Sequence, residues 1–351
     1  MQQIVQSNRL TKIDFLRSLA IIIMIFANSS PYIFQGPHPI WFRLFCSIAA
    51  PLFIFLSGYS FHLSFRTNKN KKHKYIQAFY ILLSAIFIDT VVWQILPFQT
   101  FDVLYLIAFG ILINTLIFEL NVTIKLSIAC IFIIGAFYLN YFVAYRFNIY
   151  EQPINLIYPK QIALSNIFEA KRWLIDGWFP LFPWTGVAIL GQIFSQKMDI
   201  LNKYINILKW VTLFTLSFFL FLVLQTISPI PERDGYLEIF YPPSPYFICF
   251  FLTLIFFLFS FFNNSKINGH RFFIFFGILG RKSMFIYIYH AFIISYILAS
   301  FAKPLRPLLF LLTNFIFILS AFAMAYLLEK IEENKLVEFV PKSIKKVLGI
   351  R

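Results

Sequence analysis

The chain has 351 residues, of which 60% are hydrophobic and only 13% are charged, and its formal net charge is +15. A soluble domain has roughly 45–50% apolar and about 25% charged residues, so this composition excludes an ordinary soluble protein. Apolar runs long enough to cross a hydrocarbon core about 30 Å thick recur along the whole sequence. We therefore predict an all-α, polytopic integral membrane protein, a helical bundle.

About ten membrane-spanning helices (ten or eleven) are expected in chain order. Their approximate ranges are 14–34, 43–64, 75–96, 102–119, 124–145, 179–195, 206–228, 245–263, 283–301 and 305–328. The segments between them are too short for a soluble domain. The sequence thus predicts a single transmembrane domain over residues 1–328, followed by an amphipathic cytoplasmic tail over 329–351. The first run lacks a small-residue cleavage site and is predicted to be an uncleaved signal anchor.

The basic residues predict how the bundle is oriented. If the N-terminus is cytoplasmic, most of the 30 lysines and arginines fall on the cytoplasmic side, as the positive-inside rule requires. We therefore predict N-in, C-in, with attraction to anionic membrane lipid as a secondary effect of the net charge. Nothing in the pattern indicates nucleic-acid binding. The three cysteines are scattered, which indicates neither a disulfide framework nor a metal site.

Two predicted extracytoplasmic loops are larger than the others. Residues 147–178 form the first, and residues 228–245, which are rich in proline, acids and tyrosine, form the second. Loops of this size on one face of a bundle could line the mouth of a substrate site. The alternative is that they only connect helices.

Ionisable residues inside apolar runs need a reason, because burying a charge in a membrane is costly. Asp14 and Arg17 are three residues apart, hence on one helix face, and can pair. That pair either anchors the helix at the interface or belongs to a functional site. Asp89 and His290 also lie in apolar runs, and we interpret them as hydrogen-bonding groups in the bundle interior rather than as catalytic ones.

Arg281 and Lys282 follow Gly277 and Gly280 at the start of the ninth predicted span. A helix N-terminus with two cations and Ser283 could hold a phosphate group. Ordinary basic flanking of a membrane span explains the same residues equally well.

The hairpin ANSSPYIFQGPHPIWFRLF, residues 27–45, joins the first two spans and carries Asn28 and His38. Prolines on both sides of His38 restrict the backbone there. A neutral imidazole can act as a base or a nucleophile, and an asparagine amide can donate to a developing oxyanion. The alternative is a loop histidine at the level of the lipid headgroups.

Three segments together resemble a known family. The first, Arg9 to Gly58, reads RLTKIDFLRSLAIIIMIFANSSPYIFQGPHPIWF and ends in AAPLFIFLSG. The second is DGWFPLFPWTGVAILGQIF, residues 176–194, and the third is LGRKSMFIYIYHAFI, residues 279–293. In this order they resemble the heparan-α-glucosaminide N-acetyltransferase catalytic-domain family of the transmembrane acyltransferase superfamily. The third segment is also similar to the acyltransferase-3 branch.

The resemblance implies a membrane enzyme that transfers an acetyl group from cytosolic acetyl-CoA to a sugar or glycan acceptor on the other side of the membrane. It implies that His38 is the catalytic histidine and Asn28 the asparagine beside it. For the CoA phosphates we predict Arg281 and Lys282 first, then Arg17 with its neighbour Asp14. The resemblance is compatible with a homodimer.

Two departures from the family pattern leave the acceptor open. Arg17 is followed by Ser18 instead of the usual glycine, and Asn28 is followed by Ser-Ser-Pro instead of a glycine-rich turn. The heavy use of Phe, Ile, Lys and Asn is typical of a low-GC bacterial genome and so indicates a bacterial inner membrane. Alternative functions are an acyltransferase-3-type O-acetyltransferase, a transporter or flippase for a lipid-linked glycan, and an acyltransferase scaffold without catalysis.

Overall fold

The structure of the protein is a computed structural model. It describes residues 2–34, 37–67, 69–143, 145–146, 151, 153, 170–204, 207–227, 233, 235–262, 270–301 and 304–333. These residues form helices and, among them, no strand, only isolated bridges.

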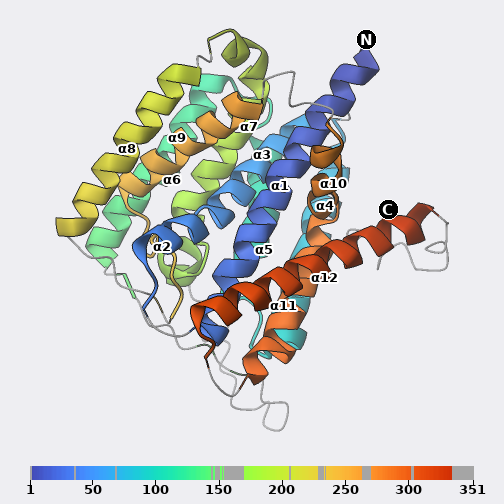
Figure 1. The fold of residues 1–351 in the computed structure, drawn as a ribbon. Helices are drawn as coiled ribbons and strands as arrows, with labels where there is room; N and C mark the ends of the chain where they lie inside the picture. Colours follow the sequence, from blue (N-terminus) through green and yellow to red (C-terminus); the bar gives the residue numbers. More distant parts are fainter. Residues whose placement is uncertain are drawn as a thin grey trace, which may run out of the picture.

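The helices follow one another in chain order with short connections. They are α1 (Gln2–Ile33), α2 (Ile40–Cys46), α3 (Ala49–Thr67), α4 (Lys71–Phe87), the π-helix η1 (Ile88–Trp93), α5 (Val103–Leu116), α6 (Val122–Val143), the π-helix η4 (Arg172–Asp176), α7 (Leu181–Tyr204), α8 (Ile207–Ile227), α9 (Pro245–Phe262), α10 (Arg271–Arg281), α11 (Ser283–Tyr296), the short 3₁₀-helix η5 (Leu298–Ser300) and α12 (Pro307–Glu333). In Figure 1, α1 crosses the bundle between α6, α8 and α9 on one side and α10, α11 and α12 on the other.

The prediction of a polytopic helical membrane protein is confirmed. Every one of the ten predicted ranges contains a helix. Within the described part of the chain, seven helical segments are long and apolar enough to cross a membrane, and α5 and the 209–222 part of α8 are shorter apolar helices. The count of ten spans and the N-in, C-in orientation stay predictions. So does the division at residue 328, since α12 runs on to Glu333 and residues 334–351 lie outside the described ones.

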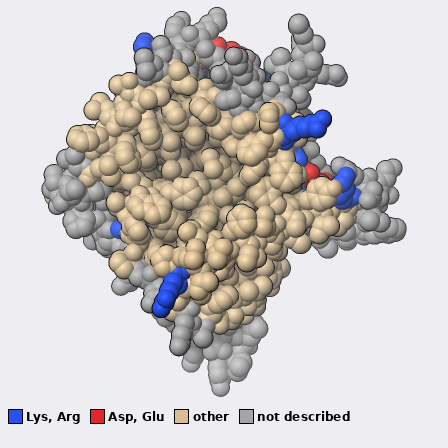
Figure 2. Space-filling view, in the orientation of Figure 1, with Lys and Arg blue, Asp and Glu red and all other residues tan. Residues whose placement is uncertain are grey.

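The surface agrees with insertion into lipid. Large apolar side chains point outward from several helices, among them Ile131 at 64% exposed, Leu216 at 62% and Ile316 at 66%. Figure 2 shows a face that is almost entirely uncharged, with a few lysines and arginines toward its margins. A contiguous apolar surface of this kind is expected where lipid chains replace water.

One helix was not predicted. The segment RFFIFFGILGR forms α10, which is too short to span a membrane and resembles a basic flank in the sequence. It packs tightly against α1 at Gly280, where a Cβ atom would lie 1.9 Å from the backbone oxygen of Asp14. The Gly280 N–H donates to the Ser18 hydroxyl at 2.8 Å, and that hydroxyl donates to the Asp14 carbonyl at 2.9 Å. Ser18, which replaces the usual family glycine, therefore joins the two helices.

Candidate active site

A cavity of about 270 Å³ lies at the Asn28 end of α1, and we call it the Asn28 cavity. Its walls come from α1, α3, η1, α5 and α11, and from both predicted extracytoplasmic loops. The polar and aromatic residues that line it are Asn28, Tyr32, Asp89, Trp93, Thr100, Asp102, Glu151, Trp178, Tyr236, Glu238, Tyr241, Tyr287 and His290. The two loops thus do more than connect helices, because they supply Glu151, Trp178 and the residues from 236 to 241.

Asn28 and His290 meet in this cavity although 262 positions separate them in the sequence. The Asn28 amide nitrogen lies 3.1 Å from His290 Nε2. His290 is 1% exposed, and its other ring nitrogen, Nδ1, is bonded to the backbone oxygen of Tyr287 one turn earlier on α11. The interpretation of His290 as an interior hydrogen-bonding group is confirmed, but it also borders the cavity, which the sequence did not indicate.

Two aspartates in the cavity wall are held by tyrosine hydroxyls. Asp89, at 1% exposed, accepts from Tyr105 at 2.6 Å and more weakly from Thr100 at 3.4 Å. Asp102 accepts from Tyr287 at 2.6 Å and caps α5 by accepting from its first N–H at the same distance. Asp102 therefore ties the N-terminus of α5 to the turn of α11 that carries His290.

The backbone around Asp89 is unusual. Asp89 and Trp93 lie on η1, a π-helix, and such segments occur frequently at functional sites. Three non-glycine residues after it have positive φ: Gln94, Phe98 and Phe101 at 55°, 69° and 44°. Backbone in this region is costly for bulky residues and persists only where its surroundings fix it. Here the Trp173 indole donates to the Phe98 carbonyl at 2.9 Å, which helps to hold the segment.

Buried acids from the two loops complete the wall. The Trp178 indole donates to Glu151 at 2.7 Å, and burial raises the pKa of the Glu151 carboxyl. Glu238 is 6% exposed, and its Oε2 has no hydrogen-bond partner. Burial raises the pKa of Glu238 to about 7, against the opposing effects of a backbone hydrogen bond and the positive charge of Arg43.

Arg233 fixes the second loop against the first. Its guanidinium is fully buried and lies 4.5 Å from the ring centroid of Trp178 and 5.0 Å from that of Tyr241. It also donates to the carbonyls of Asp176 and Gly177 at 2.7 and 3.0 Å. Cation–π contacts and charged hydrogen bonds of this kind are strong when desolvated, so the aromatic residues of the cavity are held in place.

His38 lies apart from this constellation. Its Nε2 is 2.7 Å from the Ser30 hydroxyl, and its ring stacks on Phe34 with centroids 4.8 Å apart. His38 is not among the residues that line the cavity. The structure therefore brings one of the two predicted catalytic residues, Asn28, into the cavity and pairs it with a histidine other than His38.

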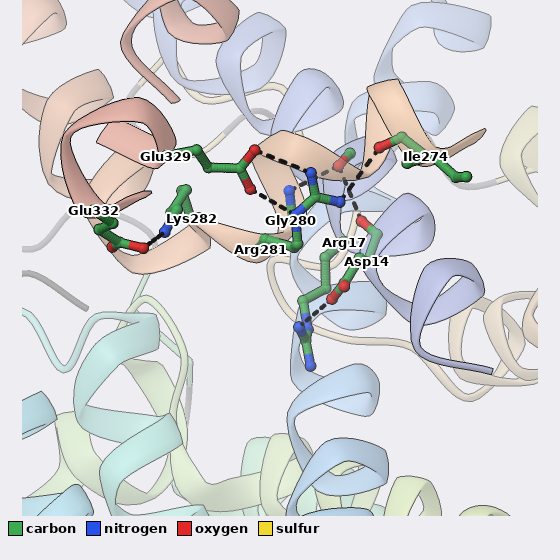
Figure 3. Close-up of polar contacts among 9 residues, drawn as sticks. Asp14, Arg17, Ile274, Gly280, Arg281, Lys282, Glu329 and Glu332 are labelled. Atoms are coloured by element: carbon green, nitrogen blue, oxygen red, sulfur yellow. Dashed lines mark hydrogen bonds and ion pairs between the residues drawn. The ribbon is translucent and has the colours of Figure 1, made fainter. Parts of the chain in front are cut away.

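The residues predicted to hold CoA lie at the other end of α1, which we call the Asp14 end (Figure 3). Arg17 donates to Asp14 at 2.9 Å and to the Ser60 hydroxyl at 2.5 Å. Arg281 makes a bidentate pair with Glu329 of α12, at 2.6 and 3.2 Å, and Lys282 pairs with Glu332. Arg281 ends α10 and Ser283 begins α11, so Lys282 does lie at a helix N-terminus, already facing a carboxylate.

Sequence reasoning missed most of the cavity wall. Asp102, Glu151, Glu238 and Tyr287 gave no signal, because an acid or tyrosine in a loop or at a span end is unremarkable in sequence. Only their convergence on one cavity distinguishes them. No group of three or more His, Cys, Asp or Glu side chains within the described ranges is arranged to hold a metal ion.

Comparison with known proteins supplies the family. A family model described as "Heparan-alpha-glucosaminide N-acetyltransferase, catalytic" matches residues 9–224, which is more than half of the chain. The chain belongs to this family. The search of curated proteins found no match. The matched range contains Asn28, His38, Asp89, Asp102 and Trp178, whereas His290 and Glu238 of the same cavity lie beyond it.

Membership of an acetyltransferase-like family and the apolar helices together make this an integral membrane protein with a transferase fold. The family as a whole uses acetyl-CoA as its co-substrate and a glycan as its acceptor.

Proposed function

We propose that this protein is a membrane acetyltransferase. It takes an acetyl group from acetyl-CoA on the cytoplasmic side and transfers it to a sugar or glycan on the opposite side. The observation that carries the proposal is the Asn28 cavity, in which an amide, an imidazole, carboxyls and aromatic rings converge inside a chain of the acetyltransferase family. A largely apolar pocket with a few convergent polar groups is the usual form of a ligand site.

Asn28 is proposed to stabilise the oxyanion that forms when the acetyl thioester is attacked. Its amide nitrogen already donates within the cavity, and a preorganised donor of this type is a large contribution to acyl transfer. By family resemblance His38 is the histidine that acts as base or carries the acetyl group. Two routes stay open: direct attack by the acceptor, and an acetyl-imidazole intermediate.

The cavity wall suits a polyhydroxylated or amine-bearing acceptor. Carboxyls such as Asp89 and Asp102 accept hydrogen bonds, tyrosine hydroxyls can donate or accept, and Trp93 and Trp178 offer flat apolar faces. Sugars present both alternating hydroxyls and apolar ring faces, so the two kinds of group match them. The same groups serve N- and O-acetylation.

For the CoA phosphates we propose the Asp14 end of α1, with Arg281 and Lys282 first and Arg17 beside Asp14 next. Arg281 and Lys282 each have a carboxylate partner on α12, so a phosphate would replace Glu329 or Glu332. Binding is therefore expected to loosen the end of α12 from α10. We further propose a bacterial inner membrane as the location. A homodimer is expected by resemblance alone.

The test uses purified protein in nanodiscs with acetyl-labelled acetyl-CoA and a panel of amino sugars and neutral glycans. The expected result is label on at least one acceptor with wild-type protein and strongly reduced transfer with Asn28→Ala and with His38→Ala. Calorimetry on the same samples should show that both variants still bind CoA. A folded wild-type protein that neither binds CoA nor releases it from acetyl-CoA would contradict the proposal and favour a transport function.

A further inference from the structure

His290 is the imidazole of the Asn28 cavity, and its tautomer follows from its two partners. Nδ1 faces the backbone oxygen of Tyr287, and a carbonyl oxygen can only accept, so Nδ1 carries the hydrogen. Nε2 is then the basic nitrogen, and it accepts from the Asn28 amide at 3.1 Å. A neutral histidine whose basic nitrogen borders a cavity has the form required of a general base.

The turn of α11 that carries His290 is fixed from a second helix. Tyr287, whose carbonyl holds Nδ1, donates its hydroxyl to Asp102 at 2.6 Å. Asp102 is the N-cap of α5 and lines the same cavity. The imidazole is thus oriented by a backbone carbonyl that is itself anchored, which is how catalytic histidines are commonly held in one tautomer.

The imidazole of His38 has a different environment. Its Nε2 is engaged with the Ser30 hydroxyl at 2.7 Å, and its ring lies between Phe34 and Phe42 with centroid separations of 4.8 and 6.2 Å. It is half-buried and outside the cavity lining. An acceptor held in the cavity therefore meets Nε2 of His290.

We infer that His290 is the catalytic base of acetyl transfer, an assignment that rests on the acetyltransferase function proposed above. The acceptor's N–H or O–H gives its proton to His290 Nε2 while the acceptor N or O bonds to the thioester carbon. The carbonyl oxygen becomes an oxyanion that the Asn28 amide stabilises. The C–S bond then breaks, the His290 imidazolium returns the proton to the CoA sulfur, and the imidazole is neutral again. If His38 carries the acetyl group, His290 still deprotonates the acceptor.

The experiment compares His290→Ala and His290→Gln with wild-type protein in the labelled acetyl-CoA assay. General base catalysis contributes about 10²–10⁴-fold, so both variants should lose at least about 100-fold in kcat, with KM for acetyl-CoA within about threefold of wild type. Added imidazole should restore part of the activity of His290→Ala. It should not help His290→Gln, in which the side chain fills the space without being able to take a proton.

A second buried histidine supplies the matched control. His62 on α3 is 7% exposed and bonds to Ser195 of α7 at 3.0 Å, outside the cavity lining. His62→Gln removes an equally buried imidazole and should leave kcat within about threefold of wild type. Gel filtration and thermal unfolding of each variant report whether the fold is kept.

The outcomes separate the two proposals. If wild-type protein transfers acetyl groups and a folded His290→Gln keeps kcat within about threefold, His290 is only structural and the inference is wrong. Loss of activity in both variants, with imidazole rescue of His290→Ala, supports it. If His290→Ala does not fold, His290→Gln alone decides. If wild-type protein transfers nothing to any acceptor, the proposed function fails first, before any variant is compared.

Discussion

The two ends of α1 use polar side chains in opposite ways. At the Asp14 end, each cation that faces α1, α10 or α12 and was predicted to bind CoA has a carboxylate partner: Arg17 with Asp14, Arg281 with Glu329, and Lys282 with Glu332. At the Asn28 end, about 16 Å from Arg17 along the helix, Asp89 and Asp102 are held by tyrosine hydroxyls instead.

The difference indicates where chemistry belongs. Ion pairs between two helices satisfy both charges and fasten the helices together. Carboxyls held by neutral hydroxyls, an amide bonded to an imidazole and the unpartnered Glu238 Oε2 leave bonding capacity toward a cavity. Buried polar atoms without partners are rare and need a reason, and a polar ligand in the cavity is the reason we propose.

The largest expected effect is on turnover at the Asn28 end. Asn28→Ala should lower kcat by about 10²–10³-fold, the usual loss of one oxyanion donor, as measured by labelled acetyl transfer. The control is the next residue, Ser29, whose hydroxyl donates to Asn314 of α12 at 2.7 Å and does not line the cavity. Ser29→Ala should cost about 1 kcal/mol of stability and leave kcat unchanged. Equal kcat losses in the two variants would remove the special role of the Asn28 end.

The second prediction concerns pH. Glu238 has a pKa of about 7 in the folded protein, against about 4.3 in an unfolded chain. The folded state therefore binds the proton more tightly. The stability from this group is full below about pH 4.3, falls as pH rises toward 7, and is lost above 7. The fall amounts to about 3–4 kcal/mol.

Thermal unfolding in detergent between pH 4 and 8 measures this effect. Glu238→Gln should unfold with a weaker pH dependence than wild type, since the amide cannot ionise. The exposed Glu119 gives the control, because Glu119→Gln should keep the wild-type profile. Identical profiles for Glu238→Gln and wild type would mean that Glu238 is not held in a desolvated wall.

The third prediction concerns the packing at the Asp14 end. A Cβ on Gly280 would lie 1.9 Å from the Asp14 backbone oxygen, so Gly280→Ala should separate α1 from α10 and cost about 1–3 kcal/mol. At Gly110 a Cβ would have its nearest neighbour at 3.8 Å, an ordinary contact. Gly110→Ala should be neutral or stabilising, because alanine favours helix. Chemical unfolding of both variants makes the comparison, and equal costs would contradict the close approach of the two helices.

The smallest expected effect is at the Arg281–Glu329 pair. The two side chains are 33% and 22% exposed, so solvent screens their attraction. Glu329→Gln should lower stability by less than about 1 kcal/mol, and less at high salt. A loss of several kcal/mol would show that this pair, like the wall of the Asn28 cavity, is electrostatically buried.

The sequence predicted the helices well where apolar length alone determines them. It did not predict α10, because an 11-residue helix with a charge at each end resembles an interfacial flank. Asn28 was predicted from its hairpin, and Asp89 and His290 stood out as polar groups in apolar runs. The pairing of Asn28 with His290 could not be predicted, since it joins α1 to α11 and depends on how the helices pack. Acids such as Glu238 become unusual only when a loop buries them.

The most direct test of acetyl transfer at the Asn28 cavity uses sealed proteoliposomes. Labelled acetyl-CoA is trapped inside, an acceptor found in the nanodisc assay is added outside, and Asn28→Ala vesicles serve as the blank. The account predicts labelled acceptor outside intact wild-type vesicles, little with Asn28→Ala, and none when acetyl-CoA and acceptor share one compartment. Labelled acceptor formed only when both substrates are on the same side would contradict transfer across the membrane through this cavity.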